Sequence, residues 1–385
     1  MIKEYIFVVR DAKKYFKRSQ KNIQNNKILL NIPSLKYCMK AAVLVKNKVV
    51  VKDFDLPKVG KNEVLVRMRA CGICGSDLEK VFGKYGMKSS RIGHEPAGEI
   101  VIIGENIKDF KKGDRVFVHH HVPCYSCHFC YNDDFTMCEK YQTSNIDPCG
   151  LSEFILVPHW NLSKGGLIRL PDNLNFSQAA LIEPIACCLR SLNKVNLKKA
   201  GTVVIFGAGP TGLMHMILAR FFGAAKLLLV DVNSFRLEFA KKIDSQVEII
   251  NMANMKEEGE FKRKSLNFLG KNGSDVSIVS TSNINAFIQS LSITRNGGTI
   301  SLFGVPPKDT KVKIDLNMLY SKELKIIPSY AASEKEIHQT IALMEAKIMN
   351  FEPLITHRFP LQDSNEALKH AHQGKDSMKI IITAG

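Results

Sequence analysis

The chain has 385 residues, of which 45% are hydrophobic and 24% charged, a length and composition that allow two domains, each with its own buried core. Its formal net charge is +17, but beyond residue 38 basic and acidic side chains alternate without a helix-turn-helix or RNA-binding motif, so we expect no nucleic-acid partner. No apolar run of about 18 residues occurs, which argues against a membrane partner.

Residues 1–38 are interpreted as a separate, disordered or helical appendage. Nine basic residues stand there against Glu4 and Asp11, a surplus of seven positive charges. The segment is rich in Lys and Asn rather than Arg and Ser, which is unlike a transit peptide. With no export signal to read, the sequence predicts a cytoplasmic protein.

Residues 39–195 are expected to form a β-rich domain, because short apolar or alternating runs follow one another between Gly and Pro residues. Strands are predicted at 39–45, 49–51, 63–70, 97–103 and 115–119.

A first group of chemically active residues follows the third of these strands. Cys74, Ser76 and Asp77 come directly after it, and His94 and Glu95 lie about twenty residues further on. A thiolate, an imidazole and a carboxylate can bind a metal ion and leave one position open for an alcohol oxygen. Taken singly, Cys74 also fits a small buried residue and His94 a hydrogen-bonded structural one.

A second group of metal-binding residues is much denser. Cys124, Cys127, Cys130 and Cys138 fall within fifteen residues, which predicts a closed tetrahedral site for a structural zinc ion. Disulfides are the alternative, but a reducing cytosol favours metal binding. The run from His119 to His121 precedes this loop and is interpreted as ordinary hydrogen-bonded residues.

Residues 196–330 are expected to form a doubly wound α/β domain with a parallel sheet. Strands are predicted at 202–206, 226–230, 275–280 and 299–303, with a helix at 213–222 after the first.

The first strand of this domain leads into a dinucleotide-binding motif. Gly207, Gly209 and Gly212 have the spacing that permits a tight turn, a close approach of pyrophosphate and tight packing of helix on strand, and Pro210 and Thr211 lie between them. Asp231 ends the next strand, where a carboxylate binds a ribose diol and repels a 2′-phosphate. The motif therefore predicts NAD rather than NADP, although Arg236 offers a positive charge to a phosphate.

The last segment, 331–385, is expected to return to the β-rich domain. Helices are predicted at 334–349 and 363–372, and strands at 355–359 and 379–383. A further strand at 324–327 could pair across a two-fold axis, so we expect a homo-oligomer, either a dimer or a tetramer.

Together these motifs resemble the zinc-dependent medium-chain alcohol dehydrogenases, and within them the sorbitol, polyol and threonine dehydrogenases. The resemblance covers residues 39–385 and includes segments 72–77, 93–95, 181–184 and 207–212 besides the cysteine loop. It implies a GroES-like catalytic domain, a Rossmann domain, and an active site in the cleft between them. It also implies two zinc ions per subunit, one catalytic and one structural.

The resemblance assigns roles to single residues. Cys74 and His94 would bind the catalytic zinc, with either Glu95 or Glu183 as the carboxylate that reaches the metal. Asp77 would fix the tautomer of His94, and Ser76 would bind the substrate hydroxyl and accept its proton. Glu79 stands where the family usually has a relay histidine, so the proton route would differ. Cys187 and Cys188 are close enough to compete as ligands but are expected in the core.

The function expected from the sequence is hydride transfer between an alcohol and NAD. Gly75 and Glu183 favour a polyol or other secondary alcohol over a simple primary one. Alternatives are a dehydrogenase for primary alcohols or threonine, a zinc-free reductase of the same fold, and a non-catalytic zinc-, nucleotide- or nucleic-acid-binding protein.

Overall fold

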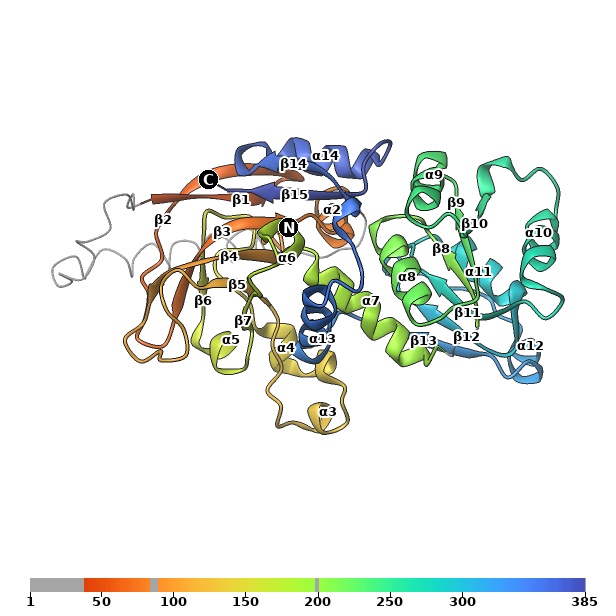
Figure 1. The fold of residues 1–385 in the computed structure, drawn as a ribbon, viewed down its shortest axis with the longest axis horizontal. Helices are drawn as coiled ribbons and strands as arrows, with labels where there is room; N and C mark the ends of the chain where they lie inside the picture. The colour runs from red at the N-terminus through yellow and green to blue at the C-terminus, as the bar shows by residue number, and fades with distance from the viewer. Residues whose placement is uncertain (1–37, 84–88, 198–200, 385) are drawn as a thin grey trace, which may run out of the picture. The chain divides into compact units, whose positions relative to one another are not determined.

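The structure is a computed structural model that describes residues 38–83, 89–197 and 201–384 (Figure 1). The predicted appendage lies outside the described residues except for Cys38. Within the described part of the chain, no helix has both the length and the apolar character needed to cross a bilayer.

A seven-stranded sheet of mainly antiparallel strands carries the first group of predicted residues (Figure 1). Its order is β14-β15-β3-β4-β5-β7, with β6 also paired to β3, and only β14 and β15 run parallel to each other. Its strands are β3 (Val64–Gly72), β4 (Glu95–Ile103), β5 (Arg115–Val118), β6 (Phe154–Val157), β7 (Leu167–Arg169), β14 (Ile355–Pro360) and β15 (Lys379–Thr383). A separate two-stranded sheet joins β1 (Cys38–Val45) and β2 (Lys48–Asp55).

The pairing of β3 with β4 brings two distant parts of the sequence together. Gly72 at the end of β3 lies opposite Glu95 at the start of β4. Cys74 follows the first strand and His94 precedes the second, so the register places both at one edge of the sheet. The helices of this region are α2 (Gly75–Phe82), α3 (His128–Tyr131), α4 (Glu139–Thr143), α5 (His159–Ser163), α6 (Phe176–Ala179), α7 (Ile182–Val195), α13 (Glu334–Glu345) and α14 (Ser364–Gln373).

A six-stranded parallel sheet carries the glycine-rich motif (Figure 1). Numbered along the chain its strand order is 3-2-1-4-5-6, the order of a doubly wound dinucleotide-binding fold. The strands are β8 (Thr202–Phe206), β9 (Lys226–Asp231), β10 (Glu248–Asn251), β11 (Ser274–Val279), β12 (Thr294–Leu302) and β13 (Lys325–Pro328). The helices between them are α8 (Pro210–Phe221), α9 (Ser234–Ile243), α10 (Glu260–Leu269), α11 (Ile284–Ile293) and α12 (Leu316–Ser321). The fold class predicted from the sequence is confirmed.

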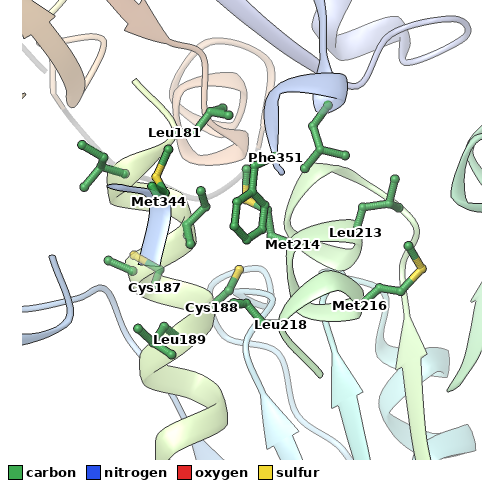
Figure 2. Packing of buried hydrophobic residues seen from close by; sticks show 14 of the residues in the cluster. Leu181, Cys187, Cys188, Leu189, Leu213, Met214, Met216, Leu218, Met344 and Phe351 are labelled. Atoms are coloured by element: carbon green, nitrogen blue, oxygen red, sulfur yellow. The ribbon is translucent and has the colours of Figure 1, made fainter. Parts of the chain in front are cut away.

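Helix α7 packs against α8 and α13, and its buried side chains form part of a large core (Figure 2). Cys187 and Cys188 lie in this core beside Leu189, with Met214 of α8 and Met344 of α13 across from them. The two cysteines therefore serve packing, as expected.

Two predicted helices have different bounds in the structure. The helix expected at 334–349 ends at Glu345, and Lys347 adopts a positive φ of 53°, a conformation that cannot continue a right-handed helix. The helix expected at 213–222 starts earlier, at Pro210, because proline suits a first helical turn. Gly212 is thereby part of the helix.

Candidate active site and metal centres

Asp77 ties the two strand ends of the candidate active site together. Its carboxylate accepts hydrogen bonds from the backbone N–H of Cys74, at 3.2 Å, and from that of Gly93, at 3.1 Å. Cys74 is the residue that caps the N-terminus of α2, while Gly93 directly precedes His94. One fully buried carboxylate thus fixes the backbone beside both predicted ligands.

The side chain of His94 is oriented by the same carboxylate. Its Nδ1 lies 3.5 Å from Asp77 Oδ1, which leaves Nε2 as the ring nitrogen available to a metal ion. Burial opposes a positive charge on the ring, but Asp77 and Cys74 outweigh it and raise the pKa of His94 well above its ordinary value. Burial likewise opposes the negative charge of Asp77, yet His94, Lys80 and the Gly93 N–H hold the pKa of Asp77 below its usual range.

Glu95 is fully buried and paired with a buried lysine from the other end of the chain. Lys379 Nζ lies 2.7 Å from Glu95 Oε1 and 2.5 Å from Oε2, and it also donates to the carbonyl of Ile73 at 2.9 Å. Burial raises the pKa of Glu95, whereas the carboxylate raises the pKa of Lys379 against the effect of that residue's own burial. Gly72 makes room for the pair, because a Cβ there would collide with the Glu95 carboxylate.

The structure brings Cys74, His94 and Glu95 together. One ligand atom from each of these residues lies within 4.8 Å of the other two, which fits a single divalent ion with an open coordination position. Glu183 is not a member of this group. It is buried at the start of α7, where Cys187 Sγ donates to its Oε1 at 3.3 Å, and its charge contributes to the raised pKa of Glu95.

The predicted proton-handling residues lie on α2. Ser76 is the second residue of this helix and is half-buried, and Glu79 follows three positions later. Residues with this spacing lie on one helix face.

Of the three consecutive histidines, His119 and His121 are hydrogen-bonded as expected, whereas His120 differs from that expectation; His121 Nδ1 lies 2.6 Å from the Ser144 carbonyl oxygen. His119 Nδ1 lies 2.7 Å from Glu334 Oε1, and Tyr125 Oη donates to Glu334 Oε2 at 2.5 Å. The ring of His120 lies 5.2 Å from that of His94, and its buried Nδ1 has no hydrogen-bond partner in the described residues. Burial, together with the neighbouring His121 and His94, lowers the pKa of His120 well below its ordinary value, so this imidazole is neutral.

The four-cysteine loop has the geometry of a tetrahedral metal site. The Sγ atoms of Cys124 and Cys138 are 3.6 Å apart, those of Cys127 and Cys130 3.6 Å, and those of Cys124 and Cys130 3.9 Å. Four sulfurs at about 2.3 Å from one zinc ion are separated by about 3.8 Å. All ten cysteines are free, so this arrangement involves no disulfide. The Ser126 N–H donates to Cys124 Sγ and lowers its pKa to about 6, which favours the thiolate.

The glycine-rich turn joins β8 to α8. Gly207 has a φ of 100°, and a Cβ on Gly212 would collide with the Gly207 carbonyl oxygen, so helix and strand approach closely. Gly209 caps α8 and has space around it, since among the described residues a Cβ there would meet only Arg236 Nη1, at 3.6 Å. The backbone N–H groups there are placed to receive a phosphate at a helix N-terminus.

Asp231 braces this turn. Its Oδ2 accepts a hydrogen bond from the Ala208 N–H at 2.6 Å, and its Oδ1 accepts from the N–H groups of Val232 and Asn233 at 2.7 and 2.8 Å. Thr211 Oγ1 lies 2.9 Å from Ser280 Oγ, which joins the motif to the end of β11. The structure thus places Gly207, Gly209, Pro210, Thr211, Gly212, Asp231 and Arg236 around one end of the parallel sheet.

Comparison with known proteins points to two families of one superfamily. Residues 60–172 match the alcohol dehydrogenase GroES-like domain, and residues 210–346 match the zinc-binding dehydrogenase domain. An L-threonine 3-dehydrogenase of Cronobacter sakazakii is 30% identical over 338 residues, which cover 86% of this chain and 95% of the relative. A sorbitol dehydrogenase of Bacillus subtilis is 28% identical over 351 residues, covering 89% and 97%. An alcohol dehydrogenase from Thermus sp. ATN1 has a similar structure, with a TM-score of 0.80, 26% identity and coverage of 90% and 100%.

Proposed function

Since the chain belongs to the zinc-dependent medium-chain alcohol dehydrogenases and is an alcohol oxidoreductase, we propose that it transfers hydride between a polyol or other secondary alcohol and NAD. The observation that carries the proposal is the convergence of Cys74, His94 and Glu95 at one edge of the seven-stranded sheet. A mixed donor set with an open position suits a metal that binds substrate.

The residues around this site divide the chemical work. When bound to Cys74, His94 and Glu95, zinc supplies a Lewis acid that lowers the pKa of an alcohol hydroxyl. Ser76 accepts the hydroxyl proton, and Glu79, on the same face of α2, passes it to solvent in place of a histidine. Asp77 holds His94 in one tautomer, and Lys379 balances the charge of Glu95.

The polar surroundings of the site favour a substrate with more than one hydroxyl group. Glu183 is a buried carboxylate whose charge contributes to the raised pKa of Glu95, and His120, whose ring lies 5.2 Å from that of His94, has a buried Nδ1 without a partner among the described residues. A buried polar group without a partner costs free energy unless a ligand hydroxyl pairs with it. A simple alkyl alcohol would leave the His120 nitrogen unpaired.

For the cofactor we favour NAD over NADP. Asp231 ends β9, where its carboxylate would accept hydrogen bonds from the ribose hydroxyls and repel a 2′-phosphate. Arg236 lies near Gly209, which suits a contact with the pyrophosphate rather than with the ribose end.

The four-cysteine loop is proposed to hold the second, structural zinc ion, because a closed shell of thiolates leaves no position for substrate. Such thiolates persist in a reducing compartment, which supports a cytoplasmic location. The outer strand β13 has a free edge in the sheet order, and we propose that it pairs with a second copy in a homo-oligomer.

The proposal is tested by NADH formation with a panel of sugar alcohols, hydroxy amino acids and primary alcohols. We expect a sugar alcohol or another secondary diol to give the highest kcat/KM, and NADP to be the poorer oxidant. Ser76→Ala should lower kcat by about 10²-fold or more while NADH binding persists. If threonine is the best substrate, the result would instead favour a hydroxy amino acid dehydrogenase, the activity in the name of the Cronobacter relative. An unchanged kcat in Ser76→Ala would remove that residue from the proton route.

A further inference from the structure

A group of three metal-binding side chains lies outside both sites described above. His357 comes from β14, His370 from α14, and Asp376 from the loop between α14 and β15. One ligand atom from each lies within 4.8 Å of the other two. None of the three belongs to the dinucleotide motif, the Cys74 site or the cysteine loop.

The distances among these side chains suit a shared ion. His370 Nε2 lies 3.0 Å from Asp376 Oδ1, and the ring centres of His357 and His370 are 4.4 Å apart. Two donors at about 2.0–2.1 Å from one zinc ion are separated by about 3.4 Å in a tetrahedral arrangement. His357 Nδ1 is occupied by Thr356 Oγ1 at 3.0 Å, so its Nε2 is the free donor.

The backbone around the three residues is fixed. β14 pairs with β15, and α14 ends at Gln373, followed by the C-cap residue Gly374, whose φ of 57° stops the helix. The Gly374 carbonyl accepts a hydrogen bond from Asn233 Nδ2 at 2.8 Å, and the Met378 N–H donates to Thr356 Oγ1 at 3.0 Å. The loop that carries Asp376 is therefore held at both ends.

Solvent can reach this cluster. The side chain of His370 is 29% exposed and that of Asp376 65% exposed. An ion can therefore enter without unfolding any element, and water can complete its coordination.

We propose that His357, His370 and Asp376 form a third metal site that binds one divalent transition-metal ion such as Zn²⁺ or Ni²⁺. Imidazole donors favour these ions over Mg²⁺ or Ca²⁺, which take oxygen ligands. A simple ion pair between His370 and Asp376 would not require His357 at van der Waals distance from His370.

An ion at this site would join β14, α14 and the loop at 374–378. That loop leads directly into Lys379, the partner of Glu95, and carries the Gly374 contact with Asn233 at the start of α9. An ion at the third site would therefore stiffen the loop at 374–378, which lies between Lys379 of the active site and the Gly374 contact with Asn233 of the dinucleotide-binding domain.

The test is equilibrium dialysis of the untagged full-length protein, with its resident zinc retained, against Ni²⁺. We expect one Ni²⁺ per chain, with affinity lowered at least about tenfold in each of His357→Gln, His370→Gln and Asp376→Asn. His372→Gln is the matched control, since His372 lies on the same helix but stacks on Phe82 instead. It should bind Ni²⁺ as the wild type does.

Three results would overturn the proposal. The first is that the wild type binds no Ni²⁺ at millimolar Ni²⁺. The second is that the three variants bind Ni²⁺ as tightly as the wild type does. The third is that Asp376→Asn alone has unchanged affinity, which would reduce Asp376 to an ion-pair partner. If a variant does not fold, anomalous diffraction from Ni²⁺-soaked wild-type crystals decides. A peak between the three side chains supports the site, and its absence contradicts it.

Discussion

The cysteine loop and the Cys74 site use the same donor, a cysteine sulfur, in opposite surroundings. In the loop, four sulfurs lie within 4.8 Å of one another, and the Cys124–Cys138, Cys127–Cys130 and Cys124–Cys130 pairs are 3.6–3.9 Å apart. At the Cys74 site a single sulfur lies close to ligand atoms of His94 and Glu95. These two residues are in turn paired with the charged side chains of Asp77 and Lys379. The first arrangement would saturate a bound ion, while the second would leave the ion open to a substrate and surround it with fixed charges.

This difference implies that the two sites fail in different ways. Damage to the open site should remove activity and leave the fold, whereas damage to the closed loop should weaken the fold.

The largest effect is expected from Cys74→Ser. Loss of a ligand to the substrate-binding metal removes several kcal/mol of transition-state stabilisation, so kcat/KM should fall by about 10³-fold or more. The unfolding midpoint in urea should change little. Cys38→Ser, at an exposed cysteine, is the control and should keep full activity. A Cys74→Ser enzyme with wild-type kcat/KM would contradict the role assigned to Cys74.

Cys130→Ser should show the converse. Removal of one thiolate from the closed shell is expected to lower the free energy of unfolding by about 4 kcal/mol, because a structural metal contributes directly to folding. Cys149→Ser is a suitable control, since Cys149 is also buried but lies outside the loop. Urea unfolding followed by circular dichroism compares the two. Equal stability of both variants would show that the loop does not depend on a metal.

Lys379→Met tests the charge balance behind the open site. The substitution leaves the buried Glu95 carboxylate without its counter-charge. We therefore expect the free energy of unfolding to fall by about 3 kcal/mol at pH 7. Lys375→Met, at an exposed lysine four residues earlier, should have no such effect. Partial recovery in the double variant Lys379→Met, Glu95→Gln would assign the loss to the unpaired charge. A Lys379→Met protein as stable as the wild type would contradict the pairing.

His94 and His215 differ in the charges around them, and this difference predicts an effect of pH on stability. His94 has carboxylate and thiolate neighbours, but His215 in α8 is buried without a charged partner among the described residues, and burial lowers its pKa to about 4. The unfolded state, with a pKa of about 6.5, therefore binds the proton first as the pH falls. Stability that is present above pH 6.5 should be lost between about pH 6.5 and pH 4.

From pH 7 to pH 5 this contribution amounts to about 2 kcal/mol. Urea unfolding at the two pH values should show a smaller loss in His215→Met than in the wild type. The same loss in both proteins would rule out His215 as a source of acid sensitivity.

The comparison also explains what the sequence could predict. The cysteine loop is local, with four ligands within fifteen residues, and the glycine motif is carried by one strand, one turn and one helix. Cys74, His94 and Glu95 were identified from their motifs and from the resemblance to the family, and the pairing of β3 with β4 explains why they meet. Which carboxylate reaches the metal depends on side-chain geometry, and the structure places Glu95, rather than Glu183, with Cys74 and His94.

Lys379 and Glu334 were missed because their partners are remote in sequence. Lys379 is the first residue of a strand that is otherwise mainly apolar, and this pattern gives no sign of a charged partner. Its partner Glu95 lies 284 residues away in the sequence. In the sequence Glu334 is an ordinary acidic residue in the first turn of a helix, although its carboxylate accepts hydrogen bonds from His119 and Tyr125. A lysine at the start of an otherwise apolar strand is the one signal that could have marked a buried charge.

The most direct test of the account is the zinc content of the purified protein after removal of loosely bound ions with a chelating resin. The account predicts two tightly bound Zn²⁺ per wild-type chain and one in Cys74→Ser, with the cysteine loop still filled. A wild-type protein that retains one Zn²⁺, bound only by Cys124, Cys127, Cys130 and Cys138, would contradict it.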